Sequence, residues 1–143
     1  SVTVFDEKSP DGRLTGKISR GLVLLVGLHR DDQIDAVAKL AKKVLELRIF
    51  EDDDGKMNRS ILDINGQLLV ISQFTLYGDT RKGRRPGFSD AMPPDRAEPM
   101  YNQFVQLLAD SGLEIQTGEF GARMAVEITN DGPVTFVLEH DLS

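Results

Sequence analysis

The sequence predicts an α+β fold, in which a single domain combines a mostly antiparallel or mixed, barrel-like β-sheet with two main helices. Three observations lead to this prediction. Short apolar runs of strand length recur along the chain, two segments have a helical period instead, and no linker, repeat or low-complexity stretch interrupts residues 1–143. A chain of 143 residues is long enough to bury a hydrophobic core in one domain.

The expected strands are apolar runs bounded by turn residues. Residues 8–12 (KSPDG) have the composition of a tight turn, so residues 2–5 and 14–18 on either side predict a hairpin. Residues 21–28 form a continuous apolar run, which predicts a strand buried on both faces. The other expected strands are residues 47–50, 68–74, 114–117, 124–129 and 134–139.

The first helical segment follows the third expected strand, and Asp31 or Asp32 is placed to cap its start. The apolar residues expected on its buried face are Ile34, Val37, Ala38, Ala41, Val44 and Leu45. Its lysines Lys39, Lys42 and Lys43 are interpreted as a solvated face, with contact to nucleic acid as the alternative.

The second helical segment ends before Gly112, because glycine commonly follows the last turn of a helix. Pro99 removes a backbone donor near the first turn, so it either starts the regular helix or bends it. The apolar residues of this segment are Met100, Tyr101, Phe104, Leu107 and Leu108.

Composition narrows the classes of function. The absence of cysteine excludes a disulfide framework and a thiolate metal site, and it fits a reducing, cytoplasmic compartment. No apolar run approaches the roughly 20 residues of a membrane span, so no membrane partner is expected. A net charge of −6 argues against a protein that grips a long stretch of nucleic acid, since neutralised phosphates supply much of that affinity. Any role with nucleic acid is therefore expected to be local.

The chain has few groups for ordinary hydrolase chemistry. Its two histidines, His29 and His140, have no sequence context that suggests a nucleophile–base pair. No set of residues has the spacing of a zinc site. Residues 51–55 (EDDDG) lack the ligand spacing and the closing glutamate of a calcium loop. We therefore expect neither a metal nor a cofactor.

Three segments are candidate sites. Polar residues interrupt the end of a strand at residues 72–76 (SQFTL), where a half-buried strand edge is the alternative. Residues 130–135 (NDGPVT) join two expected strands; they form either a simple turn or a loop with a cis Gly-Pro peptide. Residues 81–85 (RKGRR) are the one positive cluster in an acidic chain. They form either a solvated loop or a phosphate contact, for which arginine is well shaped.

These segments resemble the signatures of the D-aminoacyl-tRNA deacylase family, also called D-tyrosyl-tRNA deacylases. Residues 72–76 resemble its Ser-Gln-x-x-Leu motif, and residues 130–135 resemble its Gly-cis-Pro motif. Residues 47–50, 55–58 and 117–124 also match, in family order and over essentially the whole chain. Family members begin with a further strand that carries an arginine beside the Gly-Pro loop, and we expect this chain to lack that strand. Two more departures from the family pattern are Pro99 and Arg123.

The resemblance implies a deacylase-type fold and a cytoplasmic homodimer with its active sites at the subunit interface. The implied partner is the tRNA acceptor end carrying a D-amino acid, and the implied reaction hydrolyses the ester between them. Glycine mischarged on the alanine tRNA is expected to be hydrolysed as well. Gly132 and Pro133 would reach in from the partner subunit, while Phe120 and Met124 would pack on the terminal adenosine. The residues expected to contact tRNA phosphates are Arg81, Lys82, Arg84 and Arg85.

The implied catalytic wall consists of Ser72, Gln73, Phe74 and Thr75. Backbone N–H groups near Phe74 and Thr75 are expected to stabilise the oxyanion. Thr75 is one candidate nucleophile; the favoured alternative is activation of water by the ribose 2′-hydroxyl of the tRNA, with Ser72 and Gln73 orienting. Two backbone carbonyls of the Gly-Pro loop, crowded against the α-carbon, would tolerate hydrogen there and reject any L side chain. The rival functions are a non-catalytic nucleic-acid-binding module, similar to replication-origin factors of the same fold, and a plain structural dimer.

Overall fold

The computed structural model describes residues 1–140 of the chain. The expected single domain also includes residues 141–143, which lie outside the described residues. In chain order, the elements are β1 (Val2–Asp6), β2 (Ser9–Gly16), β3 (Gly21–Val26), α1 (Ile34–Glu46), β4 (Phe50–Glu51), β5 (Met57–Arg59), β6 (Gln67–Ser72), the 3-10 helix η1 (Phe74–Tyr77), α2 (Pro94–Ala109), β7 (Ile115–Thr117) and β8 (Arg123–Val126).

The strands form three small sheets. In the order β2-β1-β8 every pair is antiparallel, in the order β3-β6-β7 every pair is parallel, and β4-β5 is an antiparallel hairpin. The α+β class with two main helices and a mixed strand arrangement is confirmed. None of the sheets within residues 1–140 closes on itself, so the barrel-like character is not confirmed.

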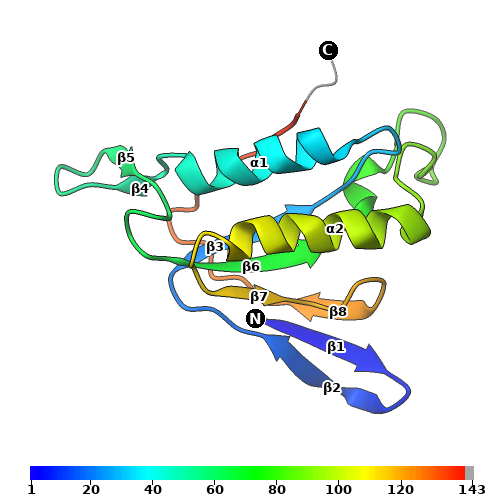
Figure 1. Ribbon diagram of the computed structural model, residues 1–143. Coiled ribbons are helices and arrows are strands. Elements are labelled where there is room, and N and C mark those ends of the chain that lie inside the picture. Colours follow the sequence, from blue (N-terminus) through cyan, green and yellow to red (C-terminus); the bar gives the residue numbers. More distant parts are fainter. Residues whose placement is uncertain (141–143) are drawn as a thin grey trace.

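The layers pack on the two faces of β6 (Figure 1). Helices α1 and α2 lie together over one face, where Leu68 and Val70 join a cluster with Tyr101 and Phe104 of α2. The opposite face contacts the β2-β1-β8 sheet, where Leu69 forms a second cluster with residues that include Val2, Ile71 and Met124. The alternation of side chains along a strand explains why neighbouring residues of β6 enter different clusters. Strand β6 is therefore buried on both faces.

Three expected strands differ from the structure. Residues 21–28 were expected to be buried on both faces, but β3 is the edge strand of its sheet and Leu25 is 44% exposed. Val23 of β3 packs into the cluster with Val2 and Leu69, whereas Leu25 belongs to neither hydrophobic cluster. Residues 134–139 form no strand, because no other strand of the described chain pairs with them. The expected strand 47–50 is reduced to its last residue, where β4 begins.

The helices contradict the expected cap and part of the expected buried face of α1, and they exclude one of the two alternatives for Pro99. Gln33 is the N-cap residue of α1 and forms no side-chain cap, while the Asp32 carboxylate accepts the His29 N–H at 2.8 Å instead. Ile34 and Ala38, both expected on the buried face, are exposed. Helix α2 begins at Pro94, so Pro99 lies inside it rather than at its start. Gly112 was expected to follow the last turn of this helix. It lies three residues after α2 ends, and its φ of 87° is a backbone conformation that favours glycine.

Leu69 offers a test of the layered core, because it is completely buried between β6 and the β2-β1-β8 sheet. Leu69→Ala should lower the free energy of unfolding by ~2–5 kcal/mol, from lost transfer energy and the remaining cavity. Leu14→Ala is the matched control, since Leu14 is 61% exposed, and it should change stability by no more than about 0.5 kcal/mol. Urea denaturation measures both variants; equal losses would contradict this packing.

Candidate active site

The candidate active site lies where β6 leaves the core. Ser72 is the last residue of the strand, and the Gln73 N–H donates to the Val26 carbonyl at 2.8 Å, which ties the turn to β3. The chain then forms η1, whose residues Phe74 and Thr75 are exposed. The Gln73 side-chain amide donates a hydrogen bond to the Thr75 hydroxyl. The four predicted catalytic residues therefore lie together in one turn.

The first amides of η1 have no partner among the described residues. The helix is closed by hydrogen bonds from the Leu76 N–H to Gln73 and from the Gly78 N–H to Thr75, at 3.2 and 2.9 Å. The first N–H groups of a helix have no carbonyl one turn earlier to bond with. The amides of Phe74 and Thr75 are in this position, and no acceptor within residues 1–140 takes their hydrogens. Two neighbouring donors are thus free to bind an oxyanion.

No general base contacts Thr75 in the described part of the chain. His29 lies beside η1, where its ring meets the Tyr77 ring edge-on at 5.3 Å between centroids. Its Nδ1, however, accepts the Asp31 N–H at 3.1 Å, and no hydrogen bond links it to Thr75. Burial raises the pKa of Tyr77, with a further contribution from Asp32. Among the described residues, no group of three or more His, Cys, Asp or Glu side chains is placed to hold a metal ion.

The basic segment 81–85 lies in a loop that Asp79 closes. The Asp79 N–H donates to the Gly87 carbonyl at 2.7 Å, and the Gly87 N–H returns a bond of 2.9 Å to Asp79. The Arg81 guanidinium donates to both carboxylate oxygens of Asp79, at 2.9 and 2.8 Å, and these hydrogen bonds lower the pKa of Asp79 to about 2. The charge of Arg81 is therefore paired with that of Asp79, while its side chain stays 83% exposed. Arg84 and Arg85 are exposed and form no ion pair within residues 1–140.

Phe120 and Met124 both lie beside the C-terminal half of β6. The half-buried Phe120 ring packs on Tyr101 with 5.9 Å between centroids, and the Tyr101 hydroxyl donates to the Val70 carbonyl at 2.8 Å. Met124 packs from β8 into the cluster that contains Ile71. Both side chains are thus next to residues of β6 that precede the turn. Their present contacts are with the protein core, and contact with an adenosine stays a prediction.

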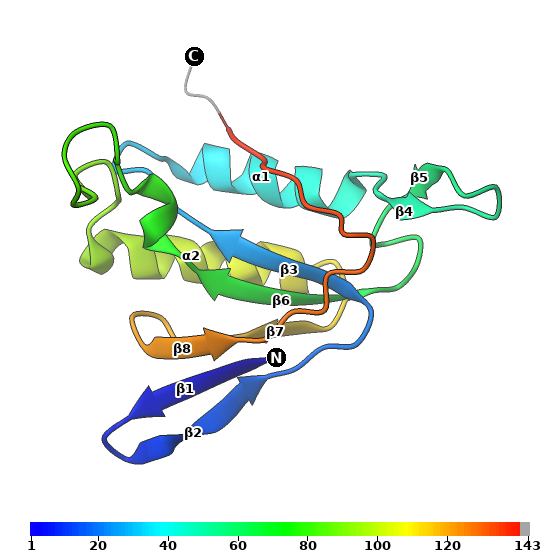
Figure 2. The ribbon, with the colours of Figure 1, turned by 180° about the vertical axis from the view of Figure 1, so that it is seen from behind.

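Residues 130–135 form an exposed loop that Asn130 holds together. Its Oδ1 accepts the Val134 N–H at 3.0 Å, and its Nδ2 donates to the Thr135 hydroxyl at 2.9 Å. The Gly132–Pro133 peptide bond in this loop is cis. Figure 2 shows the C-terminal segment, orange to red, leaving β8, passing the start of β3 and continuing alongside α1. No hydrogen bond within residues 1–140 joins this loop to residues 72–76.

Sequence reasoning missed the residues that shape these loops. Asp79 and Asn130 each bind backbone or side-chain groups two to five residues away. Both are residue types that commonly organise turns in this way. The spacing of Asp79 and Arg81 was visible in the sequence and was the signal that could have revealed their pairing. Arg13 and Glu119 carry no such signal, since 106 residues separate them.

Comparisons with known proteins identify the family of this chain. The family model described as D-Tyr-tRNA(Tyr) deacylase matches residues 1–139. A D-aminoacyl-tRNA deacylase of Thermosipho africanus is 53% identical over 129 residues, covering 90% of this chain and 87% of the relative. One from Bacillus thuringiensis is 54% identical over 139 residues, covering 97% and 91%.

Two solved structures are also similar. The c-Myc DNA Unwinding Element Binding Protein superposes with a TM-score of 0.88 at 40% identity, over 99% of this chain and 92% of that one. A probable eukaryotic D-amino acid tRNA deacylase, 16% identical with a TM-score of 0.68, shares the fold over 88% of each chain. The family match covers nearly the whole chain and includes both signature segments, so the chain belongs to the D-Tyr-tRNA(Tyr) deacylase family.

Proposed function

We propose that this protein hydrolyses the ester that joins a D-amino acid to the end of tRNA, releasing free amino acid and tRNA. Glycine mischarged on the alanine tRNA is a further substrate. The observation that carries the proposal is the pair of amides at Phe74 and Thr75, which bind no acceptor within residues 1–140 and belong to exposed residues at the end of a strand with a buried centre. Two donors on a rigid support are what the tetrahedral intermediate of acyl transfer requires.

The chemistry needs little beyond these donors. An aminoacyl ester is already labile, and each oxyanion donor typically contributes ~3 kcal/mol of transition-state stabilisation. The ribose 2′-hydroxyl of the tRNA helps to activate the attacking water, because no residue in the described chain acts as a base toward Thr75. Gln73 fixes the Thr75 hydroxyl, and Ser72 completes the wall of the site.

Selection of D-amino acids is assigned to the Gly132–Pro133 loop of a partner subunit. Its backbone carbonyls would crowd the α-carbon and leave room for hydrogen but for no L side chain. The proposed homodimer is supported by apolar residues that a lone chain leaves exposed, among them Leu25 at 44%, Phe136 at 51% and Val137 at 82%. Contact with a partner subunit would remove this apolar surface from water. The location proposed for the dimer is the cytoplasm; among the described helices, none is long and apolar enough to cross a membrane.

A second function, nucleic-acid binding without catalysis, is favoured by one observation. The solved structure with 40% identity and a TM-score of 0.88 is named for binding a DNA unwinding element. A release assay with D-aminoacyl-tRNA separates the two functions. A purified protein that binds this tRNA but releases no amino acid above the uncatalysed rate would support the binding module and overturn the deacylase.

Thr75→Ala should retain substantial deacylation, because water activation is assigned to the substrate rather than to this hydroxyl. Thr75→Ser, which keeps the hydroxyl bonded to Gln73, is the matched control. Single-turnover release of D-amino acid measures both. Loss of several orders of magnitude in Thr75→Ala alone, with the fold intact, would identify Thr75 as the nucleophile. Undiminished hydrolysis of a 2′-deoxy substrate would equally contradict substrate assistance.

Replacing Arg84 and Arg85 together by alanine should weaken tRNA binding and reduce the slope of log affinity against log salt by about 1 per lost phosphate contact. Hydrolysis of saturating substrate should change little. A variant with Lys8→Ala and Lys17→Ala removes the same charge from the β1–β2 side and should bind normally. Equal affinity and salt dependence in both variants would show that the basic loop is only solvated.

Glycine carried on tRNA should be hydrolysed, whereas L-alanine on the same tRNA should be spared. Glycine has only hydrogens on its α-carbon and meets no clash with the carbonyls of Gly132 and Pro133. Glycine loses at most the ~1–3 kcal/mol of binding free energy that a missing methyl group costs in a pocket that contacts the side chain. The methyl group of L-alanine would point at those carbonyls and clash with them. This steric clash, which D-alanine and glycine avoid, provides the discrimination.

The measurement for this selection is a time course of release for D-alanine, glycine and L-alanine esters at equal enzyme concentration. D-alanine and glycine should be released rapidly, and L-alanine at close to the uncatalysed rate. If glycine resists hydrolysis as L-alanine does, the side chain is positively recognised and rejection by main-chain atoms is wrong.

A further inference from the structure

We propose that Arg13 is a positioning residue for residues 118–122, the loop that carries Phe120, and so controls how tightly the 3′-terminal nucleoside of tRNA is held. The part of this inference that concerns tRNA rests on the proposed function, in which Phe120 contacts that nucleoside. The part that concerns the loop rests on the structure alone.

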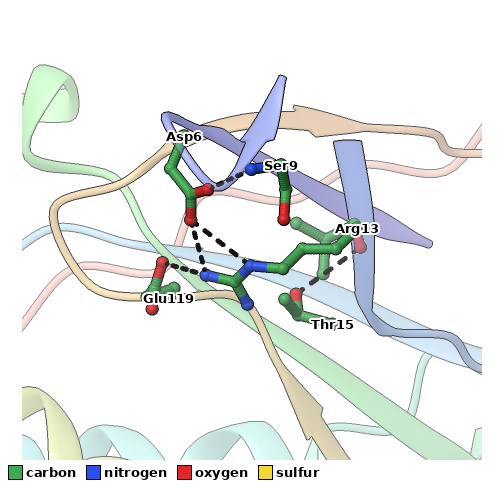
Figure 3. Close-up of polar contacts among 6 residues, drawn as sticks. Asp6, Ser9, Arg13, Thr15 and Glu119 are labelled. Carbon is green, nitrogen blue, oxygen red and sulfur yellow. Dashed lines mark hydrogen bonds and ion pairs between the residues drawn. The ribbon is translucent and has the colours of Figure 1, made fainter. Parts of the chain in front are cut away.

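The guanidinium of Arg13 joins two distant parts of the chain (Figure 3). Arg13 lies on β2, and its Nη2 donates to Asp6 Oδ2 on β1 at 3.1 Å and to Glu119 Oε2 at 2.8 Å. Its Nε donates more weakly to the same Asp6 oxygen at 3.4 Å. Glu119 belongs to the connection between β7 and β8. One nitrogen therefore ties the N-terminal hairpin to the loop that carries Phe120.

The hairpin end of this network is held in place. Asp6 Oδ1 accepts the Ser9 N–H at 2.7 Å in the tight turn between β1 and β2, which leaves Oδ2 directed toward Arg13. The hydrogen bond from Arg13 lowers the pKa of Asp6, and the same bond raises the pKa of Arg13. Both groups therefore keep their charges around neutral pH, and the anchor persists under assay conditions.

The loop end transmits this restraint to Phe120. The Ala122 N–H donates to the Glu119 carbonyl at 3.2 Å, so Phe120 lies within a tight turn that begins at the anchored residue. At the start of the loop, a side chain on Gly118 would come within 2.5 Å of Met124 Sδ, which shows how closely the loop lies on β8. Fixing Glu119 therefore limits the positions that Phe120 can take.

Removal of Arg13 would delete its attraction to Asp6 and Glu119 and would also leave these two carboxylates facing each other. The carboxylate oxygens of Asp6 and Glu119 share one nitrogen, so they lie no farther apart than the sum of their two distances to it. Without the cation, two like charges would face each other and push the loop away from the hairpin. Because exposed ion pairs contribute little to global stability, the expected effect is local movement and not unfolding.

The test compares Arg13→Gln, Arg13→Lys and the double variant Arg13→Gln, Glu119→Gln, with Lys8→Gln as a control on the same hairpin. Amide hydrogen exchange of residues 118–122 is measured on the protein alone, and KM and kcat are measured with D-aminoacyl-tRNA. Arg13→Gln should exchange several-fold faster in this loop and raise KM several-fold with kcat nearly unchanged. Arg13→Lys and the double variant should recover most of both effects, and Lys8→Gln should match the wild type.

Each alternative result has a defined meaning. Unchanged exchange in Arg13→Gln would overturn the positioning role of Arg13. Faster exchange with unchanged KM would overturn the link to nucleoside binding. Failure of the double variant to recover would contradict repulsion between Asp6 and Glu119. A wild-type protein that releases no amino acid would overturn the proposed function instead, and the exchange data would still decide whether Arg13 holds the loop.

Discussion

Burial of β6 on both faces is the interaction on which the rest of the structure depends. Leu68 and Val70 hold α1 and α2 on one side, while Leu69 and Ile71 hold the β2-β1-β8 sheet on the other. All four side chains are at most 1% exposed. The strand is thus fixed in position, and the turn that follows Ser72 starts from a rigid support. Precise placement of donors is easier from such a support than from a free loop.

The candidate site uses this support in two ways. The amides of Phe74 and Thr75 remain free because η1 begins immediately after the strand, so no earlier helical turn supplies an acceptor. The loop that carries Phe120 approaches the same strand from β7, and the Arg13 network restrains it from the hairpin side. The proposed site thus combines groups that three separate layers hold in place.

The sequence predicted those elements whose signals are local. The apolar run of β6 and the periods of α1 and α2 specify their own structure, and residues 72–76 and 130–135 could be singled out by composition. Residues 134–139 have strand-like side chains, yet they pair with no strand within residues 1–140. Asp32 does not cap α1, because its carboxylate accepts the His29 N–H instead. Asp79 binds the guanidinium of Arg81 and so competes with the predicted phosphate contact. Such competition between partners cannot be read from spacing alone.

The central claim is that the reacting ester binds at the end of β6. The most direct measurement maps backbone amide shifts on titration with a stable analogue, in which a D-amino acid is joined by an amide bond to 3′-amino-adenosine. We expect the largest shifts at Phe74, Thr75 and residues 118–122, with much smaller shifts for the L analogue. Shifts confined to other surfaces, or equal shifts for both enantiomers, would contradict it.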